Sequence, residues 1–112
     1  MNWNEYTEGV KRTELTEEQY VEAGKRLANK ARLNHSAQGL VTEAGEFIDQ
    51  IKKHVYYGRE LDTVNLEEEL GDMCWYLAVA CDELNIDFEK MCQQNIDKLK
   101  ARYPEKFTES DR

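Results

Sequence analysis

The chain has 112 residues, which is enough for one small domain and too few for two ordinary ones. Apolar residues make up 40% and charged residues 34%, a balance typical of a folded domain. The net charge of −8 argues against binding to nucleic-acid polymers or to anionic membranes. We therefore expect one cytoplasmic domain over residues 1–112, with its core at about 16–104 and a polar tail at 108–112.

Targeting and cysteine chemistry are constrained by the same composition. No stretch approaches the length of a membrane span, and the acidic N-terminal residues do not resemble a signal peptide. The cysteines, Cys74, Cys81 and Cys92, are odd in number and lie in apolar helical patterns. We interpret them as reduced thiols of the core, and not as disulfides or zinc ligands.

Apolar residues at helical spacing predict an all-α fold, a bundle of four main helices. A short helix over residues 2–12 precedes them. Thr16 and Gln19 form a capping box for the first main helix, which we expect to end near residue 33. A polar junction follows at residues 34–38.

The remaining helix ends also have sequence signals. Either Asn34 or Ser36 is the expected N-cap of the second main helix, and Gly58 is its expected end. Asn65 is the expected N-cap of the third, which reaches about residue 84. The last helix begins at Asp87 and stops before the only proline, Pro104.

The second and third main helices have apolar lines that we expect to form the core. These lines are Leu40, Ala44, Phe47, Ile48, Ile51 and Val55, and Leu66, Leu70, Met73, Cys74, Leu77, Cys81 and Leu84. Small domains bury a smaller fraction of their surface than large ones, so this core is thin. We therefore expect the bundle to be completed in a homodimer or homotetramer.

One acidic pattern, Leu-x-x-Glu-x-Gly-acid, occurs twice, at residues 40–46 and 66–72. It places Glu43 with Glu46, and Glu69 with Asp72, one helical turn apart on matching faces. Like charges at this spacing weaken a helix unless something offsets them. Packed together, the two helices would point four carboxylates into one cleft. Ordinary solvated acids are the competing interpretation.

Two further observations favour a cation site over solvated acids. Gly45 and Gly71 cost about 1 kcal/mol each inside a helix, and close approach of two helix backbones would explain them. Carboxylates without histidine suit Mg²⁺, with Mn²⁺ as a second possibility, better than zinc or copper. A di-iron bundle would need Glu-x-x-His motifs, which His35 and His54 do not supply.

Basic and amide side chains on the last helix are candidates for phosphate binding. Asn95, Lys98 and Arg102 share one helical face and would suit phosphate oxygens, although cations are also common near a helix C-terminus. His35, just before the first acid motif, and Lys53, just after it, are possible substrate contacts.

Taken together, these motifs resemble the MazG-like all-α nucleoside triphosphate pyrophosphohydrolases. The similarity lies in the spacing Glu43-x-x-Glu46 and Glu69-x-x-Asp72, in the wording Glu69-Leu70-Gly71-Asp72, and in the closing residues 95–104. It covers roughly residues 36–107, and either acidic half alone is weak evidence.

The resemblance implies Mg²⁺-dependent hydrolysis of a nucleoside triphosphate to the monophosphate and pyrophosphate. In that family the four acids hold the metal, one glutamate orients or deprotonates water, and residues matching Asn95, Lys98 and Arg102 position phosphates. It also implies helical dimers or tetramers whose sites draw on more than one chain. A dUTP-type diphosphatase, a phosphoribosyl-ATP hydrolase and a non-enzymatic acidic interaction module are the alternatives.

Overall fold

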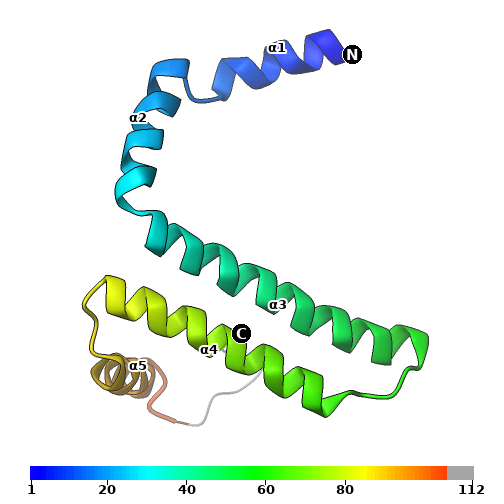
Figure 1. Ribbon diagram of the computed structural model, residues 1–112, viewed down its shortest axis with the longest axis vertical. Coiled ribbons are helices and arrows are strands. Elements are labelled where there is room, and N and C mark those ends of the chain that lie inside the picture. The colour runs from blue at the N-terminus through cyan, green and yellow to red at the C-terminus, as the bar shows by residue number, and fades with distance from the viewer. Residues whose placement is uncertain (106–112) are drawn as a thin grey trace.

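Five helices make up the part of the chain that the structure, a computed structural model, describes, residues 1–105 (Figure 1). They are α1 (Trp3–Thr13), α2 (Glu17–Asn29), α3 (Ala31–Tyr57), α4 (Thr63–Glu83) and α5 (Phe88–Arg102). No strand occurs within residues 1–105, so the all-α prediction is confirmed. The predicted tail at 108–112 lies outside the described residues.

Several helix ends coincide with the predicted sequence signals. Thr16 accepts a hydrogen bond from the Gln19 backbone, and the Gln19 side chain accepts one from the Thr16 backbone, which completes the capping box. Gly58 ends α3 in the left-handed conformation, with φ of 68°. Asp87 caps α5 through the backbone N–H of Lys90.

The predicted junction at residues 34–38 is wrong, because those residues lie inside α3. Ser36 donates its hydroxyl hydrogen to the Leu33 carbonyl, and Gln38 donates to the Asn34 side chain. Polar side chains satisfied within the helix do not end it. The break occurs instead at Lys30, where φ is −124° and ψ is 21°, with no side-chain cap for α3.

The predicted cap of α4 is also wrong. Asp62 is the N-cap, and its Oδ1 accepts a hydrogen bond from the Asn65 backbone N–H at 3.0 Å. Asp is as good an N-cap as Asn, and Asp62 lies three residues earlier. The side chain of Asn65 is therefore released from capping.

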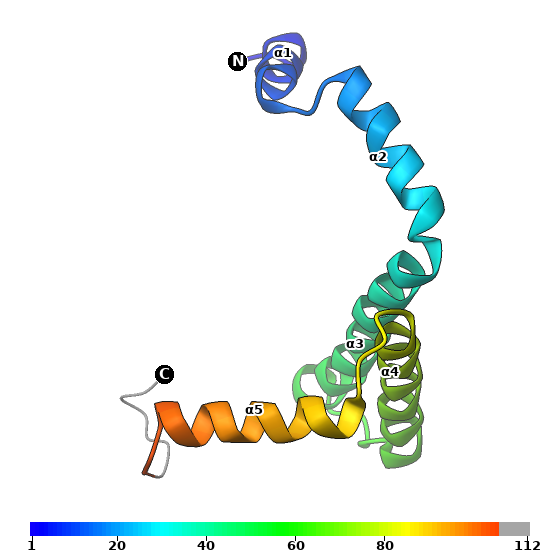
Figure 2. The ribbon, with the colours of Figure 1, turned by 90° about the vertical axis from the view of Figure 1, so that its left-hand side faces the viewer.

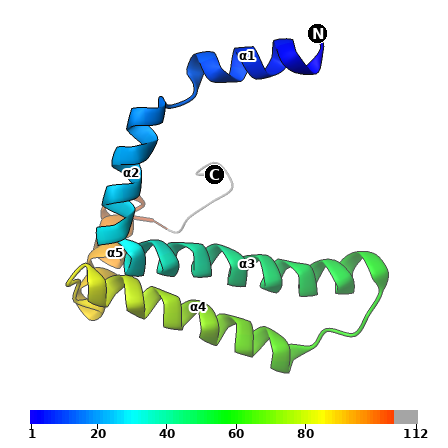
Figure 3. The ribbon, with the colours of Figure 1, turned by 45° about the horizontal axis from the view of Figure 1, so that its top comes forward.

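Helices α3 and α4 form an antiparallel hairpin that contains the tightest packing in residues 1–105 (Figures 1 and 3). Only Ser36, Gly39 and Cys81 are buried within that range. A Cβ atom at position 39 would overlap the Tyr76 ring, so Gly39 permits this close approach. Arg32 closes one end of the hairpin, with Nη1 at 2.8 Å from Asp82 and 3.2 Å from Glu83.

The close-approach role predicted for Gly45 and Gly71 is wrong. A Cβ atom at either position would meet nothing within 4 Å. The helices are tightest about one and a half turns before Gly45, where the small residue faces an aromatic ring. A glycine does permit close approach of the two helices in this hairpin, but it is Gly39 and not Gly45 or Gly71.

The other three helices extend away from the hairpin as arms (Figure 2). The radius of gyration is 20.4 Å, against about 13 Å for a compact chain of about this size. The arms display large apolar side chains to solvent, among them Trp3, Tyr6, Tyr20, Leu27, Phe88, Ile96 and Leu99. Within one chain, the described helices therefore do not close into a bundle.

Several predicted core positions are exposed for the same reason. Ile48 and Val55 on α3, Leu70 on α4 and Leu84 just after α4 have 47–62% of their surface accessible. All three cysteines are free, as predicted, but only Cys81 is buried, because Cys74 and Cys92 lie on uncovered faces. None of the helices in residues 1–105 combines the length and apolar character required to cross a membrane.

Candidate metal centre

The repeated acidic motifs face each other across the α3–α4 hairpin. Glu43 comes from α3, and Glu69 and Asp72 come from α4. One oxygen from each of these three carboxylates lies within 4.8 Å of the others. Glu43 and Glu69 are partly buried, whereas Asp72 is exposed. The hairpin thus brings together carboxylate oxygens from Glu43 and from Glu69, which are 26 residues apart in sequence.

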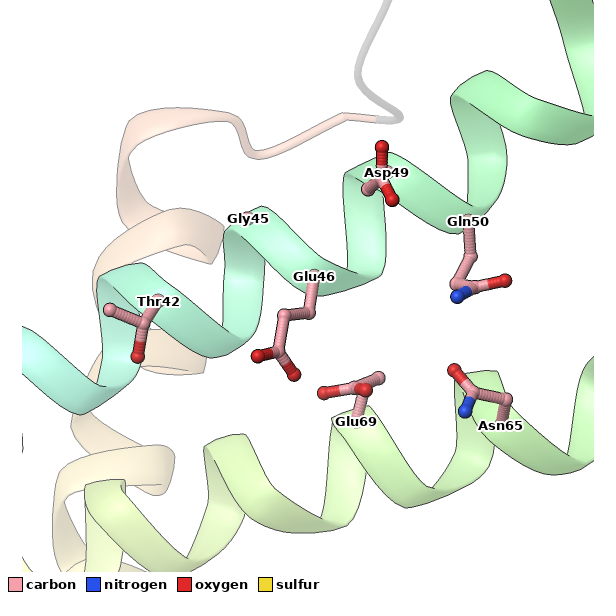
Figure 4. Close-up of a pocket in the computed structure, with 7 residues that line it drawn as sticks. All are labelled: Thr42, Gly45, Glu46, Asp49, Gln50, Asn65 and Glu69. Atoms are coloured by element: carbon pink, nitrogen blue, oxygen red, sulfur yellow. The ribbon is translucent and has the colours of Figure 1, made fainter.

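Glu46, the fourth predicted acid, lies beside this group and lines an adjoining pocket. Figure 4 shows its carboxylate and that of Glu69 extending toward each other from the two helices. The pocket has a volume of about 480 Å³. Its lining residues are Thr42, Gly45, Glu46, Asp49, Gln50, Asn65 and Glu69. Glu69 therefore belongs both to the three-oxygen group and to the pocket.

The crowding of carboxylates changes the acidity of Glu69. Its hydrogen bond with Glu43, reinforced by partial burial and by the neighbouring Glu46, raises the pKa of Glu69 to about 7. Crowding by the neighbouring acids therefore makes the ionised form of Glu69 less favourable, and a bound cation would offset this effect.

A divalent cation fits the donor atoms of this group. Oε2 of Glu43 and Oε2 of Glu69 are buried and accept no hydrogen bond from the described residues. Buried acceptors without a donor are costly, and a cation would satisfy them while removing the repulsion between the acids. An all-oxygen set matches hard cations such as Mg²⁺ and Mn²⁺.

Lys53 does not join the acids, because it is paired on the surface of α3. Its Nζ lies 2.9 Å from Asp49, and Lys52 lies 4.0 Å from the same carboxylate. The hydrogen bond from Lys53 lowers the pKa of Asp49, with the charges of Lys53, Lys52 and Arg59 adding to the effect. Lys53 therefore balances the negative charge of Asp49, which lines the pocket.

The proposed phosphate-binding residues on α5 are not brought to the acids within one chain. Helix α5 starts beyond the end of α4 and runs crosswise to the hairpin (Figures 1 and 2). At 1.5 Å per residue, Lys98 lies about 15 Å along α5, and Asp72 about 17 Å back along α4. Asn95, Lys98 and Arg102 are exposed and separate from the carboxylate group.

Neither histidine takes part in the acidic group. The ring of His35 packs edge-on against Tyr76, with centroids 5.7 Å apart. The Nδ1 atom of His54 lies 2.8 Å from the Arg59 carbonyl, just past the end of α3. Any contact of His35 with a substrate would therefore be made beside Tyr76 and not at the acids. His54 contacts the backbone just after the end of α3.

Sequence reasoning missed two amide side chains of the pocket, Gln50 and Asn65. Gln50 follows Glu46 by four residues, and Asn65 precedes Glu69 by four. Residues four apart share a helix face, so this spacing was the available signal. It was overlooked because Asn65 also suited the role of helix cap.

Comparison with known protein families agrees with the acidic repeat. Residues 33–107 match the model of the MazG nucleotide pyrophosphohydrolase domain. The chain belongs to the MazG family. The matched range includes α4, α5, nearly all of α3 and therefore both acidic motifs.

A named relative is also found. Gene 37 protein of Mycobacterium phage L5 is 35% identical over 77 residues, which cover 62% of this chain. The chain spans 65% of the length of that phage protein. No solved structure matches.

Proposed function

We propose that this MazG-family protein hydrolyses nucleoside triphosphates, with Mg²⁺ as cofactor, to the nucleoside monophosphate and pyrophosphate. The observation that carries the proposal is the group of carboxylate oxygens from Glu43, Glu69 and Asp72 within 4.8 Å of one another. Two of these acids have buried oxygens without a donor. Family membership supplies the class of reaction, and the acidic group supplies a place for its cofactor.

The four acids divide between two roles in this proposal, metal binding and activation of water. Glu43, Glu69 and Asp72 hold the cation, whose charge, when it is bound, neutralises the triphosphate and stabilises the transition state. Glu46 lies in the pocket outside the three-oxygen group and is exposed. In this proposal Glu46 orients the attacking water and accepts its proton as the bond between the α- and β-phosphates breaks.

The triphosphate also needs positive charge that the pocket lacks. The pocket contains three acids, Glu46, Asp49 and Glu69, and the nearby Lys53 is committed to Asp49. The free basic face is on α5, far from the acids of its own chain. We therefore infer a homo-oligomer in which Asn95, Lys98 and Arg102 of one copy reach the acidic group of another.

The direct test is to incubate the purified chain with Mg²⁺ and a panel of ribo- and deoxynucleoside triphosphates. We expect pyrophosphate and monophosphate in equal amounts, and no turnover when Mg²⁺ is removed by a chelator. Orthophosphate as the product, or no product across the panel, would contradict the proposal. Turnover of dUTP alone, or of phosphoribosyl-ATP alone, would instead assign one of the related activities.

A further inference from the structure

Asn65 has an unusual place for an amide side chain. It lies in the first turn of α4, where Asp62 caps the helix through the Asn65 backbone and leaves the side chain free. Because Asn65 precedes Glu69 by four residues, the two share a helix face. Figure 4 shows the Asn65 amide in the same pocket as Glu46 and Glu69.

The carbonyl oxygen of this amide, Oδ1, is buried and accepts no hydrogen bond from the described residues. Leaving a buried acceptor unsatisfied costs about 1–3 kcal/mol. The charged residues that line the pocket, Glu46, Asp49 and Glu69, offer acceptors when ionised. The Gln50 amide faces Asn65 across the pocket but makes no hydrogen bond to Oδ1, which therefore stays open to a donor on whatever binds there.

Hydrated divalent cations carry such donors. Mg²⁺ usually keeps several of its waters in protein sites, and their hydrogen atoms point outward from the ion. Residues that accept these hydrogens fix the hydration shell as an outer layer of ligands. Asn65 is the candidate in this pocket, because its acceptor is buried beside Glu69 of the three-oxygen group.

We propose that Asn65 is a positioning residue of the cation site, with Oδ1 accepting a hydrogen bond from the hydration shell of the bound cation. This inference rests on the proposed cation site and not on the identity of the nucleotide. It extends the site from four carboxylates to an amide one helical turn before Glu69. The neighbouring Gln50 amide faces Asn65 from α3 (Figure 4) and closes this end of the pocket.

If the oxygen and nitrogen of the Asn65 amide exchanged places, its role in the pocket would differ. If the NH₂ group faced the acids, Asn65 would donate to a carboxylate and hold it in place. Asn65→Asp separates the two arrangements, because it keeps an acceptor and removes the donor. Asn65→Leu removes both groups at similar volume.

The experiment measures binding of Mn²⁺ alone to the full chain, by the electron paramagnetic resonance signal of free Mn²⁺. We expect Asn65→Leu to weaken binding by about 10-fold, the lower end of the range for outer ligands of metals. Its melting temperature without metal should stay equal or rise, because an unsatisfied acceptor is removed. Asn65→Asp should bind Mn²⁺ at least as tightly as the wild type.

Asn4→Leu is the matched control, since Asn4 lies in the first turn of α1 and is exposed. It should bind Mn²⁺ as the wild type does. Wild-type affinity in Asn65→Leu, or a loss in Asn65→Asp as large as that in Asn65→Leu, would overturn the role of Asn65. Absence of Mn²⁺ binding by the wild type, or unchanged binding by Glu69→Gln, would instead overturn the cation site itself and the proposed function with it.

Discussion

The α3–α4 hairpin and the three arms differ in how they satisfy their apolar residues. In the hairpin, Gly39 meets the Tyr76 ring, and Ser36 and Cys81 are buried between long helices. In the arms, apolar side chains at helical spacing remain exposed, although α1 and α2 have strongly amphipathic sequences. An amphipathic helix needs a surface to cover. Among the described helices, only α3 and α4 pack extensively against each other, and the apolar faces of the arms and the outer faces of the hairpin have no cover within one chain.

The largest effect is expected from variants that test whether one active site combines the hairpin of one copy with α5 of another. Glu69→Gln in the hairpin and Lys98→Ala on α5 should each reduce pyrophosphate release by about 100-fold or more, since each removes several kcal/mol of charge stabilisation. Mixed and refolded together, the two variants should regain activity, because some sites then combine an intact Glu69 with an intact Lys98. Lys90→Ala, on the same helix, is the control and should remain active. Failure of the mixture to recover would contradict a site shared between two copies, and full activity of Lys98→Ala alone would place Lys98 outside the site.

A second test concerns the apolar face of α5. Ile96→Glu should weaken assembly by at least about 10-fold, because an isoleucine contributes roughly 1.5–3 kcal/mol when it is buried against a partner. Light scattering after size-exclusion chromatography measures the change. Gln94→Glu, which places the same side chain on the opposite face of α5, should leave the assembly intact. A wild-type chain that is monomeric at all concentrations would show that the arms stay uncovered.

The hairpin itself is tested by a pair of glycine substitutions. Gly39→Ala should destabilise the protein by about 1–3 kcal/mol, because the new methyl group overlaps the Tyr76 ring. Gly71→Ala meets open space on α4 and should stabilise by up to about 1 kcal/mol through helix propensity. Urea denaturation measures both. Equal effects of the two substitutions would contradict the close approach at Gly39.

The smallest expected effect is a dependence of stability on pH. The pKa of Glu69 is raised in the folded protein from its ordinary value of 4.5 to about 7, so the folded state binds a proton more tightly than the unfolded state. The resulting stability is present below pH 4.5 and is lost as the pH rises through about 7. Without metal, the melting temperature should therefore fall between pH 5 and about 8. Glu69→Gln should flatten this dependence, and Mg²⁺ should offset the loss in the wild type. A metal-free melting temperature that rises over this interval would contradict the raised pKa of Glu69.

Sequence alone predicted the local features of the fold well. The capping box of Thr16, the left-handed Gly58 and the cap at Asp87 depend on a few neighbouring residues, and all were correct. The caps predicted at Asn34 or Ser36 and at Asn65 were wrong, because α3 begins after Lys30 without a side-chain cap and Asp62 caps α4 three residues before Asn65. Tertiary contacts were harder to predict. Gly39 was missed because its partner, Tyr76, lies 37 residues away.

For the candidate site, too, the sequence predicted the features within the two main helices but not the placement of α5. Matched helical frames predicted that acids of α3 and α4 would face one another, and Glu43, Glu69 and Asp72 do so. The frames did not predict that α5, which contains Lys98, would run crosswise to the hairpin. The direction in which a helix leaves a turn depends on contacts beyond the turn. A sequence pattern on one helix contains no record of those contacts.

The junction at Lys30 separates the direction of the N-terminal arm from the geometry of the acids. Helices α2 and α3 meet there through backbone hydrogen bonds, from Lys30 to Leu27 and from Asn34 to Lys30, without a side-chain cap. A change of backbone angle at this single residue would redirect α2, and α1 with it, while Glu43 and Glu46 stay in place. The direction of the N-terminal arm and the arrangement of the acids are therefore set by separate parts of the backbone.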